Sequence, residues 1–179
     1  SFYWVRVYQC GVVFFCSRRQ AITLWRIQKQ LKNKQSELSN KYDKYVPLSL
    51  KISPDLSEDE IGSVASSLLQ WKFDSVVATN TTLDRDFLPD HPHSRESGGL
   101  SGAPLMEKAT KAVKALKSHL EDEIPIIAAG GIMSASDAAE KFSAGAKLVQ
   151  IYSGFIYHGP KLIKQINDCY EPAYSKRQG

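Results

Sequence analysis

Apolar residues form four short runs along this chain, and the longer stretches around them carry apolar residues at helical spacing. The runs lie near residues 47–52, 74–79, 124–129 and 147–152. Runs of this length, bounded by polar residues or glycine, are typical of buried β-strands. Because each run is followed by a helical pattern, the sequence predicts strands that alternate with helices, which is typical of a parallel α/β sheet.

The helical stretches carry start and stop signals. Ser57 and Glu60 have the spacing of a capping box, and an apolar helix face follows them. Gly145 is placed to end a later helix. The remaining helical patterns cover about residues 22–42, 109–120 and 136–144. The first of these, rich in Lys and Gln, is expected to be an amphipathic surface helix.

Two successive turns suggest an anion site. Gly130 and Gly131 follow the third run, and Ser153 and Gly154 follow the fourth. A residue without Cβ lets the backbone approach a ligand closely, and the start of the next helix offers N–H groups to a phosphate. Turns of this kind after consecutive strands are typical of the last two loops of a (β/α)8 barrel. The alternative is that these glycines only close tight turns.

Two other strand ends carry candidate site residues. A lysine within an apolar strand is unfavourable unless its charge has a partner, so Lys51 is a candidate; alternatively its ammonium reaches solvent from the strand end. Thr79, Asn80 and Thr81 end the second run, where hydroxyl and amide groups suit a small polar ligand or form a plain polar turn. The polar stretch 83–97 has the length of a lid or binding loop.

Composition fits one soluble globular domain, with 179 residues, 42% apolar and 23% charged. Residues 1–46 hold nine Lys or Arg against two acids, and the rest hold fourteen against seventeen. This basic excess is spread along one helix, so we expect a solvated face and no nucleic-acid partner. The three cysteines and four histidines lack metal-site spacing, so a reducing compartment and no metal are expected. These residues are Cys10, Cys16, Cys169, His91, His93, His119 and His158.

The amino-terminal segment 2–16 is apolar but short. Arg6 and Gln9 interrupt it, and its basic neighbours follow it, so it fits neither a membrane span nor a signal peptide. It could form a strand. The chain begins with Ser1 instead of Met, which we interpret as a fragment or a processed product.

Five motifs together resemble the dihydroorotate dehydrogenases, most closely the quinone-linked, membrane-associated class in its bacterial form. They are Lys51–Leu56, Ala78–Thr82, Gly98–Gly102, Gly130–Ile132 and Val149–Gly154, and the match runs from about Leu24 to Ile166. The resemblance implies the carboxyl-terminal half, four βα units, of a (β/α)8 TIM barrel that binds FMN. It also implies oxidation of dihydroorotate to orotate in pyrimidine synthesis, with a quinone as electron acceptor.

The resemblance also implies residue roles. Lys51 would lie beside the flavin ring, where its charge stabilises the anionic reduced flavin. Asn80 and Thr81 would hold the carboxylate and ring amides of orotate. The other flavin contacts would be Thr79, Gly102, Gly131, Tyr152 and Ser153, the last three around the phosphate.

The chain departs from the family at its start. Residues 1–20 match nothing in it, so we divide the chain into an unmatched segment, 1–20, and a partial FMN-binding barrel domain, 21–179. The family's catalytic serine should fall near residues 6–11, and no serine is there. The family's other half, which supplies quinone and membrane contacts at the cytoplasmic side of the inner membrane, is also absent. We therefore expect this chain to be inactive alone, to lie in the cytoplasm, and to leave unpaired sheet edges.

Two other hypotheses stay open. In the first, the chain belongs to another phosphate-binding barrel enzyme, and Lys51 forms a Schiff base of the aldolase kind. In the second, it is a non-catalytic remnant that binds a nucleotide or another chain through its open edge.

Overall fold

The computed structural model describes residues 13–16, 21–86, 91–92 and 94–175. Its elements in chain order are β1 (Val13–Cys16), α1 (Ala21–Tyr42), β2 (Ser49–Ile52), α2 (Glu58–Gln70), β3 (Ser75–Ala78), η3 (Ala103–Leu105), α3 (Met106–Leu120), β4 (Ile126–Ala129), α4 (Ala135–Ser143), β5 (Leu148–Gln150), α5 (Ser153–His158) and α6 (Pro160–Ser175).

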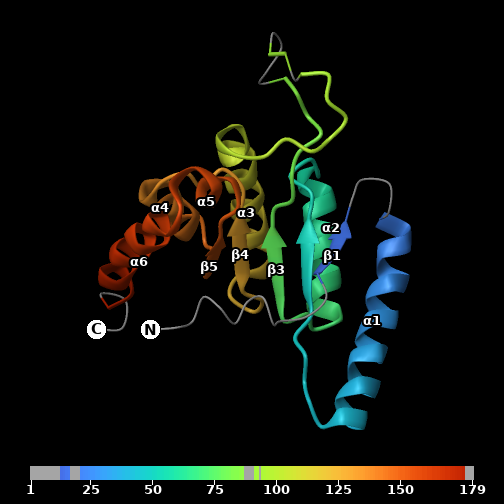
Figure 1. Ribbon diagram of the computed structural model, residues 1–179. Coiled ribbons are helices and arrows are strands. Elements are labelled where there is room, and N and C mark those ends of the chain that lie inside the picture. Colours follow the sequence, from blue (N-terminus) through green and yellow to red (C-terminus); the bar gives the residue numbers. More distant parts are fainter. Residues whose placement is uncertain (1–12, 17–20, 87–90, 93, 176–179) are drawn as a thin grey trace.

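The strands form one parallel sheet in the order β1-β2-β3-β4-β5, with β1 and β5 at its edges. β2 to β5 are the four predicted apolar runs. The prediction of four strands was incomplete, because β1 lies in the segment 2–16 and extends the sheet beyond β2. All arrows point the same way in Figure 1, so the loops that follow the strands gather at one end of the sheet.

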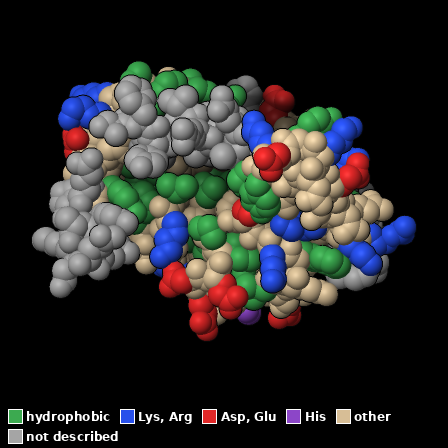
Figure 2. All heavy atoms as spheres, turned by 90° about the horizontal axis from the view of Figure 1, so that it is seen from below, with side chains coloured by type: hydrophobic (Ala, Val, Ile, Leu, Met, Phe, Trp, Pro, Cys, Tyr) green, Lys and Arg blue, Asp and Glu red, His purple; other side chains and the backbone are tan. Residues whose placement is uncertain are grey.

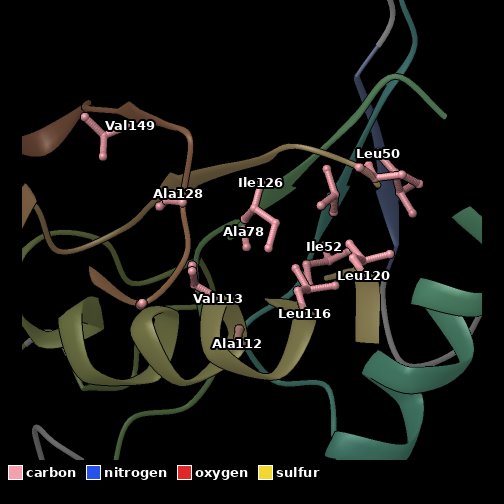
Figure 3. Packing of buried hydrophobic residues seen from close by; sticks show 14 of the residues in the cluster. Leu50, Ile52, Ala78, Ala112, Val113, Leu116, Leu120, Ile126, Ala128 and Val149 are labelled. Atoms are coloured by element: carbon pink, nitrogen blue, oxygen red, sulfur yellow. The ribbon is translucent and has the colours of Figure 1, made fainter. Parts of the chain in front are cut away.

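One face of the sheet is covered by α2 and α3 (Figure 1). Strand side chains alternate between faces, and Leu50 and Ile52 of β2 point to this covered face with no exposed surface. Figure 3 shows Ile52 close to Leu116 and Leu120 of α3. Fully burying each such side chain stabilises the fold by about 1.5–3 kcal/mol. The strands that carry the candidate site are therefore fixed from behind by the helices.

The other face carries a row of residues set by the strand register: Lys51, Val77, Ile127 and Leu148. Leu148, at the β5 edge, is 40% exposed. Viewed from the amino ends of the strands, hydrophobic side chains form a band across the molecule (Figure 2). Val77, in the same row, is only 5% exposed, so this face is partly covered. A parallel sheet with helices over one face is the arrangement expected of part of a (β/α)8 barrel.

The predicted helices are present. The Ser57 hydroxyl accepts from Glu60 N, and the Glu60 carboxylate accepts from Ser57 N at 2.7 Å, which confirms the capping box. Gly145, with φ +114°, follows the end of α4 as expected.

Helix α1 buries polar side chains, whereas the sequence analysis expected an amphipathic surface helix. Gln28 and Gln35 are buried, whereas the apolar Leu38 is 40% exposed. The Gln35 amide donates to Val46 O at 2.7 Å, and Gln28 accepts from the Ser67 hydroxyl. Hydrogen bonds to neighbouring elements therefore satisfy the Gln35 amide nitrogen and the Gln28 amide oxygen. The buried amide nitrogen of Gln28 has no hydrogen-bond partner among the described residues. In the described part of the chain, no helix is both long enough and apolar enough to cross a membrane.

Candidate active site

A cleft with a volume of about 420 Å³ lies at the carboxyl ends of β2 to β5. Each of these strands or the loop after it contributes to its wall. All eight residues that the sequence predicted for the site line this cleft: Lys51, Thr79, Asn80, Thr81, Gly102, Gly131, Tyr152 and Ser153. Residues up to 102 positions apart in the sequence thus meet at one end of the sheet.

Lys51 extends from β2 on the open face of the sheet, between the buried Leu50 and Ile52. It is partly buried, and this loss of water lowers the pKa of its ammonium below the ordinary value. A ligand that becomes negatively charged in the cleft would favour the ammonium again.

The segment after β3 is hydrogen-bonded to both neighbouring strands. Thr79 N donates to Ala129 O at 2.7 Å, and Asn80 N donates to Ile52 O at 2.8 Å. The Thr79 hydroxyl donates to Asn80 O, so this side chain is occupied by the backbone. Asn80 and Thr81 are partly exposed at the cleft. Because hydrogen bonds to both neighbouring strands fix the backbone of this segment, the positions from which the Asn80 and Thr81 side chains extend are well defined.

A charged cluster that the sequence analysis missed ties this segment to its neighbours. The Asp55 carboxylate accepts from Lys108 Nζ at 2.7 Å, from the Thr82 hydroxyl at 2.5 Å and from Leu83 N at 3.0 Å. Lys108 also pairs with Asp84 at 2.8 Å. Burial raises the pKa of Asp55, but these hydrogen bonds outweigh it and lower the pKa below its ordinary value. The loops after β2 and β3 are thereby joined to α3.

The loop before η3 closes over the same segment. A Cβ on Gly99 would collide with the Thr81 side chain, so this position suits glycine. Gly102 has φ +82°, and the Ser101 hydroxyl lies 3.0 Å from the Ser153 hydroxyl. The loop thus reaches from Thr81 to the start of α5. Ser101 also lines the cleft; it lies within the Gly98–Gly102 motif, but the sequence analysis predicted no role for it.

The glycine turn after β4 was expected to leave room for a phosphate, and the structure shows a different neighbour. Gly131 has φ +79°, and a Cβ there would lie within 2.5 Å of Met106 Cβ and closer still to the Met106 backbone. A Cβ on Gly154 would likewise meet Ile132 O. Packing within the protein therefore requires glycine at both positions, and whether these turns also bind an anion stays a prediction.

Side chains take up two of the N–H groups at the start of α4, where the sequence analysis expected N–H groups to be offered to an anion; the anion site itself stays a prediction. The Ser134 hydroxyl accepts from Asp137 N at 3.2 Å, and the Asp137 carboxylate accepts from Met133 N at 2.9 Å. The helix start is therefore capped by its own side chains.

Gln150 lies within the Val149–Gly154 motif, but the sequence analysis predicted no role for it. It lines the cleft from β5, and its buried amide oxygen has no hydrogen-bond partner among the described residues. A buried acceptor without a partner is unfavourable, so a ligand N–H at this point would stabilise it. The described residues contain no group of three or more His, Cys, Asp or Glu that could hold a metal ion.

The sequence of this chain matches the profile of the dihydroorotate dehydrogenase family over residues 19–171. The chain belongs to this family. A relative from Shewanella denitrificans, named dihydroorotate dehydrogenase (quinone), is 60% identical over 136 residues, which are 76% of this chain and 40% of the relative. One of the same name from Psychromonas ingrahamii is 57% identical over 136 residues, again 76% and 40% of the two chains. This chain spans about 40% of the length of these relatives.

Solved structures agree with the fold. The chain resembles Eimeria tenella DHODH in complex with ferulenol, with a TM-score of 0.80 and 28% identity, over 88% of this chain and 48% of that one. The ligand-free form from the same organism gives a TM-score of 0.79 and 29% identity over 88% and 49%. These relatives are TIM barrels, which confirms the prediction that this chain forms part of such a barrel.

Proposed function

We propose that this chain is the FMN-binding part of a quinone-linked dihydroorotate dehydrogenase, which oxidises dihydroorotate to orotate in pyrimidine synthesis. One observation carries the proposal: the eight residues that the family resemblance implies all line a single cleft. They come from four separate strands, so chance would not gather them. The activity belongs to the longer protein of which the relatives are examples.

The cleft fits FMN in the features that the structure provides. Its volume of about 420 Å³ suits a cofactor of this size, and its lining includes several glycines. Gln150 offers a buried acceptor to a ring N–H. When bound, FMN would accept hydride from the substrate and deliver electrons to a quinone.

Different residues of the chain would contact different parts of the cofactor and the substrate. Lys51 would place its ammonium where the flavin ring gains negative charge, an electrostatic contribution made without solvent reorganisation. Asn80 and Thr81 would orient orotate, and Tyr152 and Ser153 would hold the phosphate. Since Gly131 packs on Met106, we assign it to the shape of the phosphate end of the cleft.

The rest of the activity would come from outside the described residues. The position expected for the catalytic serine, residues 6–11, lies outside them, and its sequence contains no serine. We assign quinone binding and peripheral attachment to the cytoplasmic side of the inner membrane to the part of the relatives that this chain does not span.

A chimera tests the proposal. Residues 19–171 would replace the matching segment of the Shewanella denitrificans relative. The purified chimera should contain FMN and reduce a quinone with dihydroorotate. In it, Lys51→Met should lower kcat about 10²–10³-fold, whereas Lys111→Met, which removes a lysine that is 74% exposed, should not. A folded chimera without flavin, or equal rates for the two variants, would contradict the proposal.

The lowered pKa of Lys51 also suits a nucleophilic amine, as the Schiff-base hypothesis requires. Family membership favours the dehydrogenase. Borohydride in the presence of a carbonyl substrate decides between them, because only a Schiff base would be trapped as a stable adduct on Lys51.

A further inference from the structure

Lys141, on α4, is the largest side chain without exposed surface in the described part of the chain. No motif marked it, and it does not line the cleft. A buried ammonium is unfavourable unless polar groups surround it. Its contacts therefore show what the position is for.

The ammonium of Lys141 is bound to the first turn of α3. Nζ donates to Met106 O at 2.9 Å and to the Thr110 hydroxyl at 2.7 Å. The Thr110 hydroxyl in turn donates to Met106 O at 2.8 Å. Within the described residues, no side chain caps the start of α3 at Leu105. The lysine thus ties α4 to the first turn of α3 through the Met106 carbonyl and the Thr110 hydroxyl.

The same helix start forms one wall of the cleft. Met106 packs backbone to backbone on Gly131, because glycine leaves no Cβ between them. Leu105 on one side of this contact, and Gly130 to Met133 on the other, line the cleft. Helix α4 begins directly after that turn, at its cap Ser134. Helix α4 is therefore connected to the Gly130–Gly131 turn at its amino end, and Lys141 binds it to the start of α3.

The charge of Lys141 does not favour stability. Burial lowers its pKa to about 8, although Glu140 and Asp137 act in the opposite direction. Replacing a buried charge by an apolar side chain of similar volume is often neutral or stabilising. Such a change would leave no orphan, because Met106 O and the Thr110 hydroxyl keep each other as partners. Stability alone therefore does not account for a lysine here.

We propose that Lys141 is a positioning residue that holds the first turn of α3 against the Gly130–Gly131 turn and so maintains the phosphate end of the cleft. The packing role stands on the contacts above, whereas the link to phosphate rests on the proposed function. Lys141 would act on the ligand only through Met106 and the turn.

The packing role is tested on the 179-residue chain. Lys141→Met is compared with Lys114→Met, the same change at an exposed lysine of α3. Amide hydrogen exchange in segments 102–110 and 129–134 should become at least about tenfold faster in Lys141→Met alone. Exchange in β2 and β3 should not change, and the midpoint of thermal unfolding should not fall. Unchanged exchange in both segments, or faster exchange throughout with a lower midpoint, would overturn the proposal.

The phosphate role is tested in the chimera with FMN and with riboflavin, which lacks the phosphate. Lys141→Met should weaken FMN binding about tenfold, measured by flavin fluorescence, and leave riboflavin binding unchanged. An equal loss for both flavins, or no loss, would overturn the phosphate role. Failure of the unsubstituted chimera to bind FMN would instead reject the proposed function, and hydrogen exchange would still decide the packing role.

Discussion

Replacing Gly131 by alanine should destabilise this chain strongly, for two separable reasons. The residue has φ +79°, a conformation that L side chains rarely adopt, and a Cβ there would overlap the Met106 backbone. Backbone atoms cannot rotate away as the end of a flexible side chain can. The change therefore strains one residue and pushes a helix start away from its neighbour.

The two contributions can be estimated. The left-handed conformation disfavours alanine by about 1–2 kcal/mol. Forcing an extra methyl group into a packed contact costs about 1–3 kcal/mol. Gly131→Ala should thus lower the free energy of unfolding by about 2–5 kcal/mol, a large share of the 5–15 kcal/mol typical of a domain.

Three other glycines separate these contributions. Gly159 has φ +61° and no described heavy atom within 4 Å of a Cβ, so its change to alanine tests strain alone, about 1–2 kcal/mol. Gly154, with no positive φ but Ile132 O in the way, tests overlap alone, about 1–2 kcal/mol after the gain in helix propensity. Gly98 has neither feature and should change stability by less than about 0.5 kcal/mol.

Urea unfolding followed by circular dichroism measures all four variants. The expected order of loss is Gly131, then Gly154 and Gly159, then Gly98, with the Gly131 loss near the sum of the middle two. A Gly131→Ala variant as stable as Gly98→Ala would refute the packing argument. The result also bears on ligand binding, because loss of flavin from a Gly131 variant would then report a displaced helix as well as a blocked phosphate.

Three further predictions concern the loops, the sheet edges and turnover. Hydrogen bonds lower the pKa of Asp55, so the stability that they add is present above its ordinary pKa of 3.8 and is lost as the pH falls below that value. Asp55→Asn should therefore lower the free energy of unfolding by about 1 kcal/mol at pH 7. In acid unfolding monitored by fluorescence, the stability of Asp55→Asn should depend less on pH below 4 than the stability of the control Asp59→Asn. With β1 and β5 as open edges and Leu148 exposed, the chain should self-associate in sedimentation experiments; a compact monomer with sharp cooperative unfolding would contradict this. The chain should not reduce a quinone or dye with added FMN and dihydroorotate, because a missing general base alone removes about 10²–10⁴-fold in rate; turnover near that of a full-length relative would reveal a base elsewhere.

The sequence predicted the elements well where local rules decide them. The four apolar runs became β2 to β5, and Ser57 and Glu60 formed the expected capping box. It also predicted which end of the sheet carries the cleft, because polar and glycine residues follow every strand. The sequence did not decide whether β1 forms, since its segment has no usable periodicity and the strand with which it pairs, β2, is distant in the sequence.

Contacts between distant segments were not predictable in this way. Lys141 looks like one more lysine on an amphipathic helix until Met106, 35 residues earlier, is found beside it. Lys108 and Asp55 are 53 residues apart and pair because the loop after β2 meets the start of α3. Gly131 showed that a glycine was needed, but not whether the space belonged to a ligand or to Met106.

The cleft can form in part of a barrel because the strands around it are neighbours both in the sequence and in the sheet. Its residues follow β2, β3, β4 and β5, and each of these strands pairs with the next in sequence. Relative positions across the site therefore depend on neighbouring strands and on the α3–α4 contact at Met106, all within this chain. The remaining part of the relatives would instead lie against the face that carries Lys51, Val77, Ile127 and Leu148, which is only partly exposed in this chain. Covering that face would remove water from around Lys51 and lower its pKa further, unless a bound anion raised the pKa again. Protonation of Lys51 and binding of an anionic ligand should therefore favour each other.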